Sequence, residues 1–171
     1  IKNILEMSRG RSPEPMRFSL STWLEKFLDD WQPVSHTPLD IEFDKALEND
    51  DVNVDRSQLM QIISNIAENG ARHGAQTNDK AVLTFRRLKN PSSGAVSLDI
   101  IDNGPGINSE DEDKIFEPFF TTQEQGNGLG LYLCRELCLA NQIHIYYRRT
   151  ELGESCFRLQ FSHPDRGTLA E

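Results

Sequence analysis

The 171-residue sequence has few basic residues, few cysteines and no long apolar run. Its 18 Lys and Arg are scattered among 27 Asp and Glu, so no surface that follows a phosphate backbone is expected, and nucleic acid is not a favoured partner. The three cysteines lack the spacing of a metal site, which is typical of reduced thiols in the cytoplasm. No apolar stretch approaches the roughly 20 residues that span a bilayer. We therefore expect a soluble, acidic, globular domain.

The chain divides into a leading segment, one domain and a tail. Residues 1–15 begin without Met in the helical spacing Ile1, Ile4, Leu5 and then become rich in Pro and charge, which is typical of a helix end followed by a linker. Regular hydrophobic patterns fill residues 16–163, and residues 164–171 form a C-terminal tail. This organisation indicates a piece of a longer protein.

Helices and strands are mixed along the domain. Periodicity predicts helices at about 20–32, 56–73 and 128–140, a short acidic helix at 109–115, and strands at 39–43, 52–54, 81–88, 95–102, 143–149 and 155–161. Ser19 or Ser21 can cap the first helix, and Asp55 with Gln58 resembles a capping box at the second. Because the strands cluster in antiparallel hairpins, the fold class expected is α+β, a two-layer sandwich with helices on one face of a sheet.

The helix over 56–73 carries a polar stripe beside its apolar face. Asn65 and Asn69 lie one turn apart, and Arg72 and His73 follow one turn further on. Asparagine is unfavourable inside a helix because its amide competes with the backbone, so two in register indicate more than a solvated surface. An amide oxygen is a good ligand for a hard cation, and Arg is a good partner for phosphate. A solvated helix face remains the alternative.

Two glycine-rich segments follow. The stretch IIDNGPGI ends a strand on Asp102 and continues with Gly104 and Gly106, which alone is typical of a tight turn. The stretch GNGLG at 126–130 places glycines at a helix start, where free N–H groups can hold phosphate oxygens. Its spacing is neither the Rossmann fingerprint nor a P-loop, so alone it is equally typical of a flexible loop.

The order of these motifs is more informative than each motif alone. An asparagine helix, a strand ending in Asp-x-Gly-x-Gly, the pair Phe119 and Phe120 and a glycine-rich helix start together resemble the N, G1, F and G2 boxes of the GHKL superfamily of gyrase, Hsp90, histidine kinases and MutL. The similarity runs from about residue 18 to residue 162. The sequence resembles the catalytic ATP-binding domain of a two-component sensor histidine kinase, and most of all the branch that controls nitrogen response or type IV pili. This implies the Bergerat fold, a mixed, mostly antiparallel sheet of about five strands with three main helices on one face.

The resemblance implies ATP and Mg²⁺ as cofactors. Asn69 would coordinate the metal, Asn65 would support the metal or its waters, and Arg72 would approach the phosphates, which makes these three the expected catalytic residues. Asp102 would accept a hydrogen bond from the adenine 6-amino group, and the glycines after it would let the backbone come close to the base. The nucleotide-binding set implied is Asn69, Arg72, His73, Asp102, Gly104, Gly106, Ile107, Phe119, Thr121, Thr122, Gly126, Asn127, Gly128, Leu129, Gly130 and Leu131.

The resemblance also distinguishes two reactions. ATPases of the gyrase and Hsp90 type carry Glu at the first N-box position to activate water, whereas kinases usually carry Asn, here Asn65. The family's acceptor histidine is followed by Glu or Asp, and His36, His73, His144 and His163 are not. We therefore expect the γ-phosphoryl to pass to a histidine on an upstream dimerisation and phosphoacceptor hairpin, and then to an Asp of a response regulator.

Three features depart from the family pattern. The ATP lid expected at about 119–126 has no cation, because none lies between Lys114 and Arg135; Asn127 replaces the usual Thr or Ser; and Asn141 would supply the left-handed helix cap in place of a glycine pair. Two alternatives stay open: a nucleotide-binding docking module with degenerate catalysis, and a GHKL serine kinase. We expect a homodimeric parent protein, in which this cytoplasmic domain follows a possible inner-membrane anchor, and a fragment that can be a monomer.

Overall fold

A computed structural model of the chain describes residues 12–35, 37, 39–43, 49–122 and 128–165. Its helices are α2 (Leu20–Trp31), the short 3₁₀ helix η1 (Gln32–Val34), α3 (Arg56–Thr77) and α4 (Gly130–Ala140). Its strands are β1 (Met16–Ser19), β2 (Leu39–Phe43), β3 (Asp51–Val54), β4 (Ala81–Lys89), β5 (Val96–Asp102), β6 (Ile143–Arg149) and β7 (Ser155–Phe161). The helix end predicted within residues 1–11 and most of the predicted tail lie outside the described residues.

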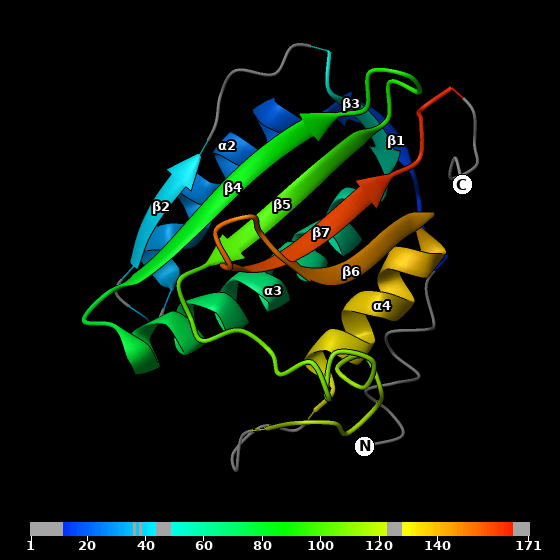
Figure 1. Ribbon diagram of the computed structural model, residues 1–171. Helices are drawn as coiled ribbons and strands as arrows, with labels where there is room; N and C mark the ends of the chain where they lie inside the picture. Colours follow the sequence, from blue (N-terminus) through cyan, green and yellow to red (C-terminus); the bar gives the residue numbers. More distant parts are fainter. Residues whose placement is uncertain (1–11, 36, 38, 44–48, 123–127, 166–171) are drawn as a thin grey trace.

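Five strands form one mixed sheet, in the order β2-β4-β5-β7-β6. β2 pairs parallel with β4, and the other pairs are antiparallel. The three α-helices cover one face of this sheet (Figure 1), and β1 pairs with β3 in a separate two-stranded sheet. The predicted α+β sandwich of three helices and five strands is therefore confirmed.

The core lies between α3 and the sheet. Leu59, Ile62, Ile63 and Ile66 follow helical spacing on α3 and are at most 1% exposed. They belong to the same apolar cluster as Leu83 of β4, together with Phe85 and Leu98. Burying one such side chain stabilises the fold by about 1.5–3 kcal/mol, so this face fixes how α3 lies on the sheet.

The N-terminus of α3 is held by a buried network. Asp55 is the N-cap, and its side chain accepts hydrogen bonds from the backbone N–H groups of Ser57 (2.9 Å) and Gln58 (3.1 Å). It also accepts the N–H of Glu14 at 2.9 Å. The N–H of Asp55 donates to Oδ1 of Asn141 at the end of α4, and Nδ2 of Asn141 donates to Oε1 of Gln58 at 2.6 Å. The predicted cap at Asp55 is confirmed, and it also joins α3 to α4 and to the entering chain.

Some local predictions were wrong. Residues 109–115 form consecutive turns in place of a helix, because Glu110 and Asp113 would repel each other three residues apart on a helix and because Ser and Asp compete for backbone groups. Gln142, with φ 56°, takes the left-handed conformation predicted for Asn141, whose side chain instead bonds Asp55 and Gln58 at the start of α3. α3 continues to Thr77, beyond the predicted end at His73, and α4 begins at Gly130. Strand β1 was missed because its four residues carry too short a pattern.

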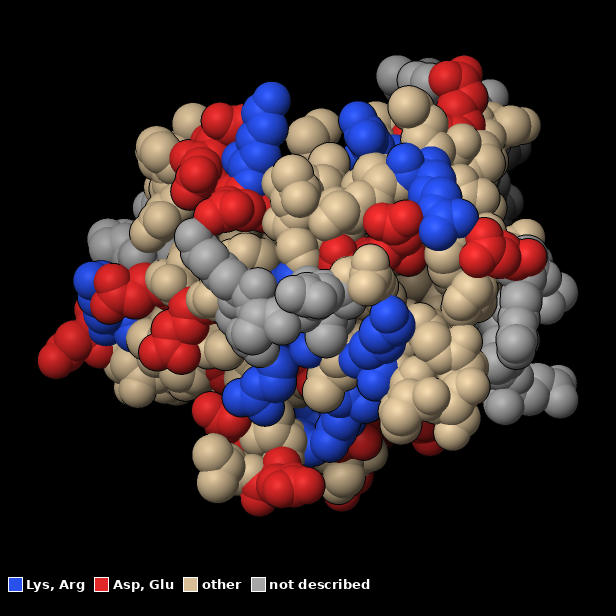
Figure 2. Space-filling model, turned by 90° about the horizontal axis from the view of Figure 1, so that it is seen from above, with Lys and Arg blue, Asp and Glu red and all other residues tan. Residues whose placement is uncertain are grey.

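The surface shows charges of both signs side by side. On the face seen in Figure 2, Lys and Arg side chains are interspersed with Asp and Glu. Arg17 pairs with Asp51 at 2.8 Å and Lys80 with Asp40 at 2.6 Å, and such exposed pairs stabilise the fold little. No helix among the described residues is both long and apolar enough to cross a membrane. All three cysteines are free and buried.

Candidate nucleotide-binding site

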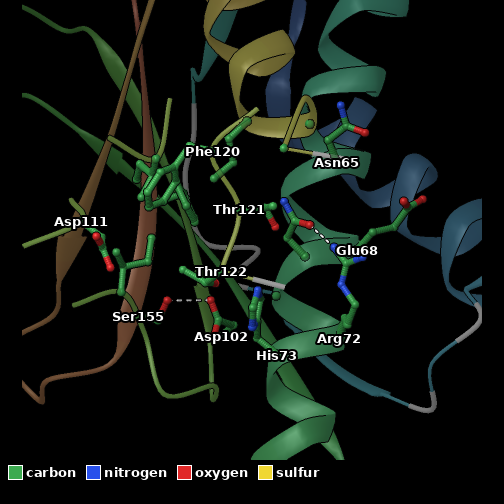
Figure 3. A pocket seen from close by; sticks show the side chains of 18 of the residues that line it. Asn65, Glu68, Arg72, His73, Asp102, Asp111, Phe120, Thr121, Thr122 and Ser155 are labelled. Atoms are coloured by element: carbon green, nitrogen blue, oxygen red, sulfur yellow. Dashed lines mark hydrogen bonds between the residues drawn. The ribbon is translucent and has the colours of Figure 1, made fainter. Parts of the chain in front are cut away.

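A cavity of about 580 Å³ lies between α3, the end of β5, the segment after it and the start of α4. This volume is typical of small-molecule sites. Figure 3 shows that its polar side chains come from different elements and face one another across the space. The lining residues are Asn65, Glu68, Asn69, Gly70, Arg72, His73, Asp102, Gly106, Ile107, Asn108, Asp111, Ile115, Phe120, Thr121, Thr122, Gly128, Leu129, Gly130, Leu131, Leu133, Ser155 and Phe157.

Asp102 forms the deep polar end of the cavity. It is the last residue of β5 and is 7% exposed. Its Oδ2 accepts a hydrogen bond from Oγ of Ser155 at 2.8 Å (Figure 3), and its Oδ1 accepts the N–H of Gly104 at 2.9 Å. Burial raises the pKa of this carboxyl, and the bonds from Ser155 and Gly104 with the nearby His73 and Arg149 oppose that rise. The side chain is therefore fixed in orientation while it lies in the cavity wall.

Two glycines allow the backbone to close around Asp102. A Cβ at Gly104 would lie 2.7 Å from Oδ1 of Asp102 and 3.0 Å from Cβ of His73. A Cβ at Gly70 would lie 2.9 Å from Cδ2 of Leu83 and 3.0 Å from Cβ of Asp102. Gly104, which was expected to approach the base, does not line the cavity; its place is against the carboxylate.

The helix α3 supplies further polar side chains of the cavity wall. The three residues predicted to be catalytic, Asn65, Asn69 and Arg72, all line the cavity. Nη2 of Arg72 donates to Oδ1 of Asn69, so the two side chains contact each other. Glu68 also lines the cavity and is exposed. One stripe of the helix therefore presents two amides, a guanidinium and a carboxylate to the same space.

His73 also lines the cavity. Its imidazole lies beside Asp102 in the cavity wall (Figure 3). Burial lowers its pKa, as does the positive charge of Arg72, and the charge of Asp102 only partly compensates. The ring is therefore neutral at neutral pH and can present an uncharged face to a ligand.

The start of α4 and the segment before it close the remaining side. Six of the residues predicted to bind the nucleotide line the cavity here: Thr121, Thr122, Gly128, Leu129, Gly130 and Leu131. Two others, Gly126 and Asn127, lie outside the described residues. Phe119 does not line it: this residue is 56% exposed, has a φ of 68° and donates its N–H to the carbonyl of Gly128 at 2.9 Å. Phe120 lies in the cavity wall in its place. A Cβ at Gly130 would meet nothing within 4 Å, so the helix start is open.

Several lining residues were missed by the sequence interpretation. Ser155 and Phe157 come from β7, and Ser155 meets Asp102 because the two are partners in the β5–β7 register. The sequence gives no signal for this pairing, since it depends on strands 53 residues apart becoming neighbours. Asp111 and Ile115 were assigned to a short acidic helix, which Asn108 precedes, whereas the turns that replace this helix face the cavity.

The donor set of the site suits a polyanionic ligand with a hard cation. Among the described residues, no group of three His, Cys, Asp or Glu could hold a metal ion by itself. A cation would depend on the amide oxygens of Asn69 and Asn65 and on oxygens of the ligand, which fits Mg²⁺, because Mg²⁺ keeps several waters and takes few protein ligands. Arg72 and the backbone N–H groups of the first turn of α4 suit phosphate.

Comparison with known proteins agrees with this geometry. Residues 54–165 match the family described as histidine kinase-, DNA gyrase B-, and HSP90-like ATPase. The chain is 38% identical over 164 residues to the sensor protein kinase PilS of Pseudomonas aeruginosa, covering 96% of this chain and 31% of PilS. It is 33% identical over 144 residues to the signal transduction histidine-protein kinase AtoS of Escherichia coli K12, covering 83% and 23%. The chain thus spans less than a third of either relative.

Solved structures show the same fold. The ATP-binding domain of PrrB from Mycobacterium tuberculosis superposes with a TM-score of 0.70 at 18% identity, over 89% of this chain and 99% of that one. Histidine kinase ThkA, in a complex with the response regulator protein TrrA, gives a TM-score of 0.69 at 24% identity, over 96% and 47%. With the matched family and the cavity, these findings lead to one conclusion: the chain belongs to the histidine kinase-, DNA gyrase B- and HSP90-like ATPases, as an ATP-binding domain of the sensor histidine kinase type.

Proposed function

We propose that this domain binds Mg-ATP in the cavity and transfers the γ-phosphoryl to a histidine on an upstream helical hairpin, from which an Asp of a response regulator receives it. One observation carries the proposal: a fixed carboxylate, Asp102, and an amide and guanidinium pair, Asn69 and Arg72, line one and the same cavity. The names of the relatives PilS and AtoS support the kinase assignment, and the ThkA–TrrA complex supports a regulator as partner.

The buried end would select adenine. Each carboxylate oxygen of Asp102 has one hydrogen bond and keeps a lone pair for a further donor. The 6-amino group of adenine is such a donor, whereas guanine presents a carbonyl oxygen there and would leave two acceptors facing each other. Ser155 and Gly104 prevent the carboxylate from turning away, so selection does not need rearrangement of the side chain.

The open end would hold the phosphates and favour transfer over hydrolysis. The bound Mg²⁺ would neutralise charge on the transferring phosphoryl group, and Asn69 with Asn65 would orient it through their amide oxygens. Arg72 and the N–H groups of α4 would contact phosphate oxygens. Asn65 cannot accept a proton from water, so no side chain at this position activates a water molecule. The γ-phosphoryl then remains available for an incoming imidazole.

A calorimetric titration with a non-hydrolysable ATP analogue, with and without Mg²⁺, tests the binding step. Binding that depends on Mg²⁺ is expected, and Asp102→Ala should abolish it. The matched control is Asp99→Ala, which removes a carboxylate three positions earlier on β5 that instead bonds Arg158 at 2.6 Å. Absence of binding by a folded chain would overturn the proposal.

Phosphoryl transfer is tested in the full-length parent protein with radiolabelled ATP. Acid-labile, base-stable labelling of the protein is expected, and Asn69→Ala should remove it. Labelling that is acid-stable would indicate a serine kinase, and release of inorganic phosphate without labelling would indicate an ATPase; either result would contradict the proposed reaction.

A further inference from the structure

The loop at residues 103–107 forms part of the cavity wall and leaves the sheet at the end of β5. Its first residue is firmly anchored: Oδ1 of Asn103 accepts the N–H of Val82 at 2.9 Å, and Nδ2 of Asn103 donates to the carbonyl of Lys80 at 3.1 Å. Its last residue, Ile107, lines the cavity together with Gly106. The position of this wall therefore depends on what holds the far end of the loop.

The far end is held by two side chains of β6. The N–H of Ile107 donates to the hydroxyl of Tyr147 at 3.0 Å. Nη2 of Arg149 donates to the carbonyls of Pro105 (3.1 Å) and Ile107 (3.3 Å), and its Nη1 donates to the carbonyl of Gly153 (2.9 Å) in the β6–β7 turn. The guanidinium thus connects the loop to the hairpin beside it by planar, forked donation that a lysine could not reproduce.

The backbone of the loop is shaped for these contacts. Gly106 has a φ of 75°, and a Cβ there would lie 2.7 Å from both the Tyr147 hydroxyl and Nη2 of Arg149. The second glycine of the Asp-x-Gly-x-Gly motif is therefore needed in this chain for the approach of the β6 side chains. Tyr147 is itself held by its ring, which packs edge-on against Phe157 of the cavity wall with centroids 5.4 Å apart.

We propose that Tyr147 and Arg149 are positioning residues for the nucleotide site, which hold the 103–107 loop in the place where Gly106 and Ile107 meet the adenine base. This inference rests on the proposed function, since it takes the base to lie beside Asp102. The two residues touch neither Asn69 nor Arg72 in any described contact, so they act on the base end of the ligand and not on its phosphates. Without them the loop populates positions in which this wall is open, and the apparent affinity falls to the intrinsic affinity multiplied by the fraction of molecules in which the wall stays closed.

The first test needs no nucleotide. Tyr147→Phe keeps the ring on Phe157 and removes only the hydroxyl that accepts from Ile107. Amide hydrogen exchange followed by NMR should show faster exchange of the Ile107 N–H by about tenfold, with the Val82 N–H, bound by Asn103, unchanged. Unchanged exchange at Ile107 would show that the hydroxyl does not hold the loop, and would overturn the proposal.

The second test separates the base end from the phosphate end. Tyr147→Phe and Arg149→Ala should each lower the affinity for nucleotide by about threefold to tenfold, because one hydrogen-bonding group is lost. In each variant the affinities for ADP and for the ATP analogue should fall by the same factor. Arg149→Lys should restore only part of the loss. Arg148→Ala is the matched control, because successive side chains of a strand point to opposite faces and Arg148 therefore lies on the side of β6 away from the loop. Arg72→Ala should instead change the ratio of the two affinities.

A glycine pair gives an independent comparison. Gly106→Ala places a methyl group between the loop and the β6 side chains and should weaken both nucleotides. Gly94→Ala imposes a similar strain, at a φ of 71°, in the β4–β5 turn, where a Cβ would have ordinary contacts with His163 at 3.4 Å, and should leave affinity unchanged. Wild-type protein that binds no nucleotide would refute the proposed function; wild-type protein that binds, with variants at Tyr147 and Arg149 that bind equally well, would refute this inference alone.

Discussion

Replacing Asp102 with Asn should reverse the base preference of the site without unfolding the domain. In Asp102→Asn, the amide oxygen can keep the N–H of Gly104, and the new NH₂ can donate to the hydroxyl of Ser155, which has free lone pairs. The second N–H of that amide then faces the ligand. Adenine presents a donor there and guanine an acceptor, so the hydrogen-bonding match is exchanged.

The magnitude follows from the hydrogen bond that is lost. A hydrogen bond to a charged group contributes about 1.5–3 kcal/mol, which corresponds to a factor of about 10 to 100 in affinity. We expect the ATP analogue to bind more weakly by that factor and the GTP analogue to bind more tightly than in the wild type. Because burial already raises the pKa of Asp102, the folded state disfavours its charge, and removing that charge should leave the thermal midpoint at neutral pH equal or higher.

Calorimetry with both analogues and thermal unfolding provide the assay. The wild type should lose stability as the pH rises through the raised pKa of Asp102, above the ordinary 3.8, because the folded state releases that proton later than the unfolded state; the Asn variant should lack this part of the pH dependence. Asp99→Asn, on the other face of β5, controls for loss of a buried carboxylate. An unchanged ratio of ATP to GTP affinity in Asp102→Asn would refute the reasoning.

Three further outcomes are expected. Gly70→Ala should lower the free energy of unfolding by about 1–3 kcal/mol, and with it the thermal midpoint and the nucleotide affinity, because its methyl group would press on Leu83 and Asp102. A higher thermal midpoint would mean that the greater helix propensity of Ala outweighs this contact. Asp55→Ala removes the N-cap of α3 and should lower the free energy of unfolding, measured by chemical denaturation, by about 1–2 kcal/mol. An unchanged free energy of unfolding would show that the cap is redundant. In the wild type, stability should rise with pH just below 6.5, because the pKa of His73 is lowered in the folded state and the unfolded state therefore takes up the proton at a higher pH. His73→Gln should reduce this rise. If the thermal midpoint of the variant depends on pH as it does in the wild type, the burial of a neutral ring is contradicted.

The fold was largely predictable because its signals are local. Ser19 and Asp55 mark the helix starts, and the apolar face of α3 follows simple spacing, so each element is encoded within a few turns of chain. The predicted helix at 109–115 was wrong because its acidic residues match helical composition, while like charges three residues apart, at Glu110 and Asp113, oppose helix formation. Composition alone did not decide between these two tendencies.

The site was predictable on one wall only. Polar residues in unusual places mark this wall in the sequence. Asparagine is unfavourable inside a helix, and a carboxylate at a strand end before two glycines is distinctive, so the sequence points to Asn65, Asn69, Arg72 and Asp102. The sequence does not single out Ser155 or Tyr147, since serine and tyrosine are ordinary residues in strands. Their contacts with Asp102 and Ile107 depend on which parts of the chain become neighbours in the fold. The contacts of Gly106 were not predicted either: the sequence suggested room for a base, and the structure adds close contact with the side chains of Tyr147 and Arg149 on β6.

The cap of α3 also has a mechanical consequence. Asp55 binds the backbone of Glu14 and, through the same carboxylate, the first turn of a helix of 22 residues, which is a stiff rod of about 33 Å. Asn65, Asn69 and Arg72 lie further along the same helix. A shift or twist of the chain at Glu14 would therefore move the whole of α3 relative to the sheet. The side chains of α3 that line the nucleotide cavity would move together with the point at which the chain enters the domain.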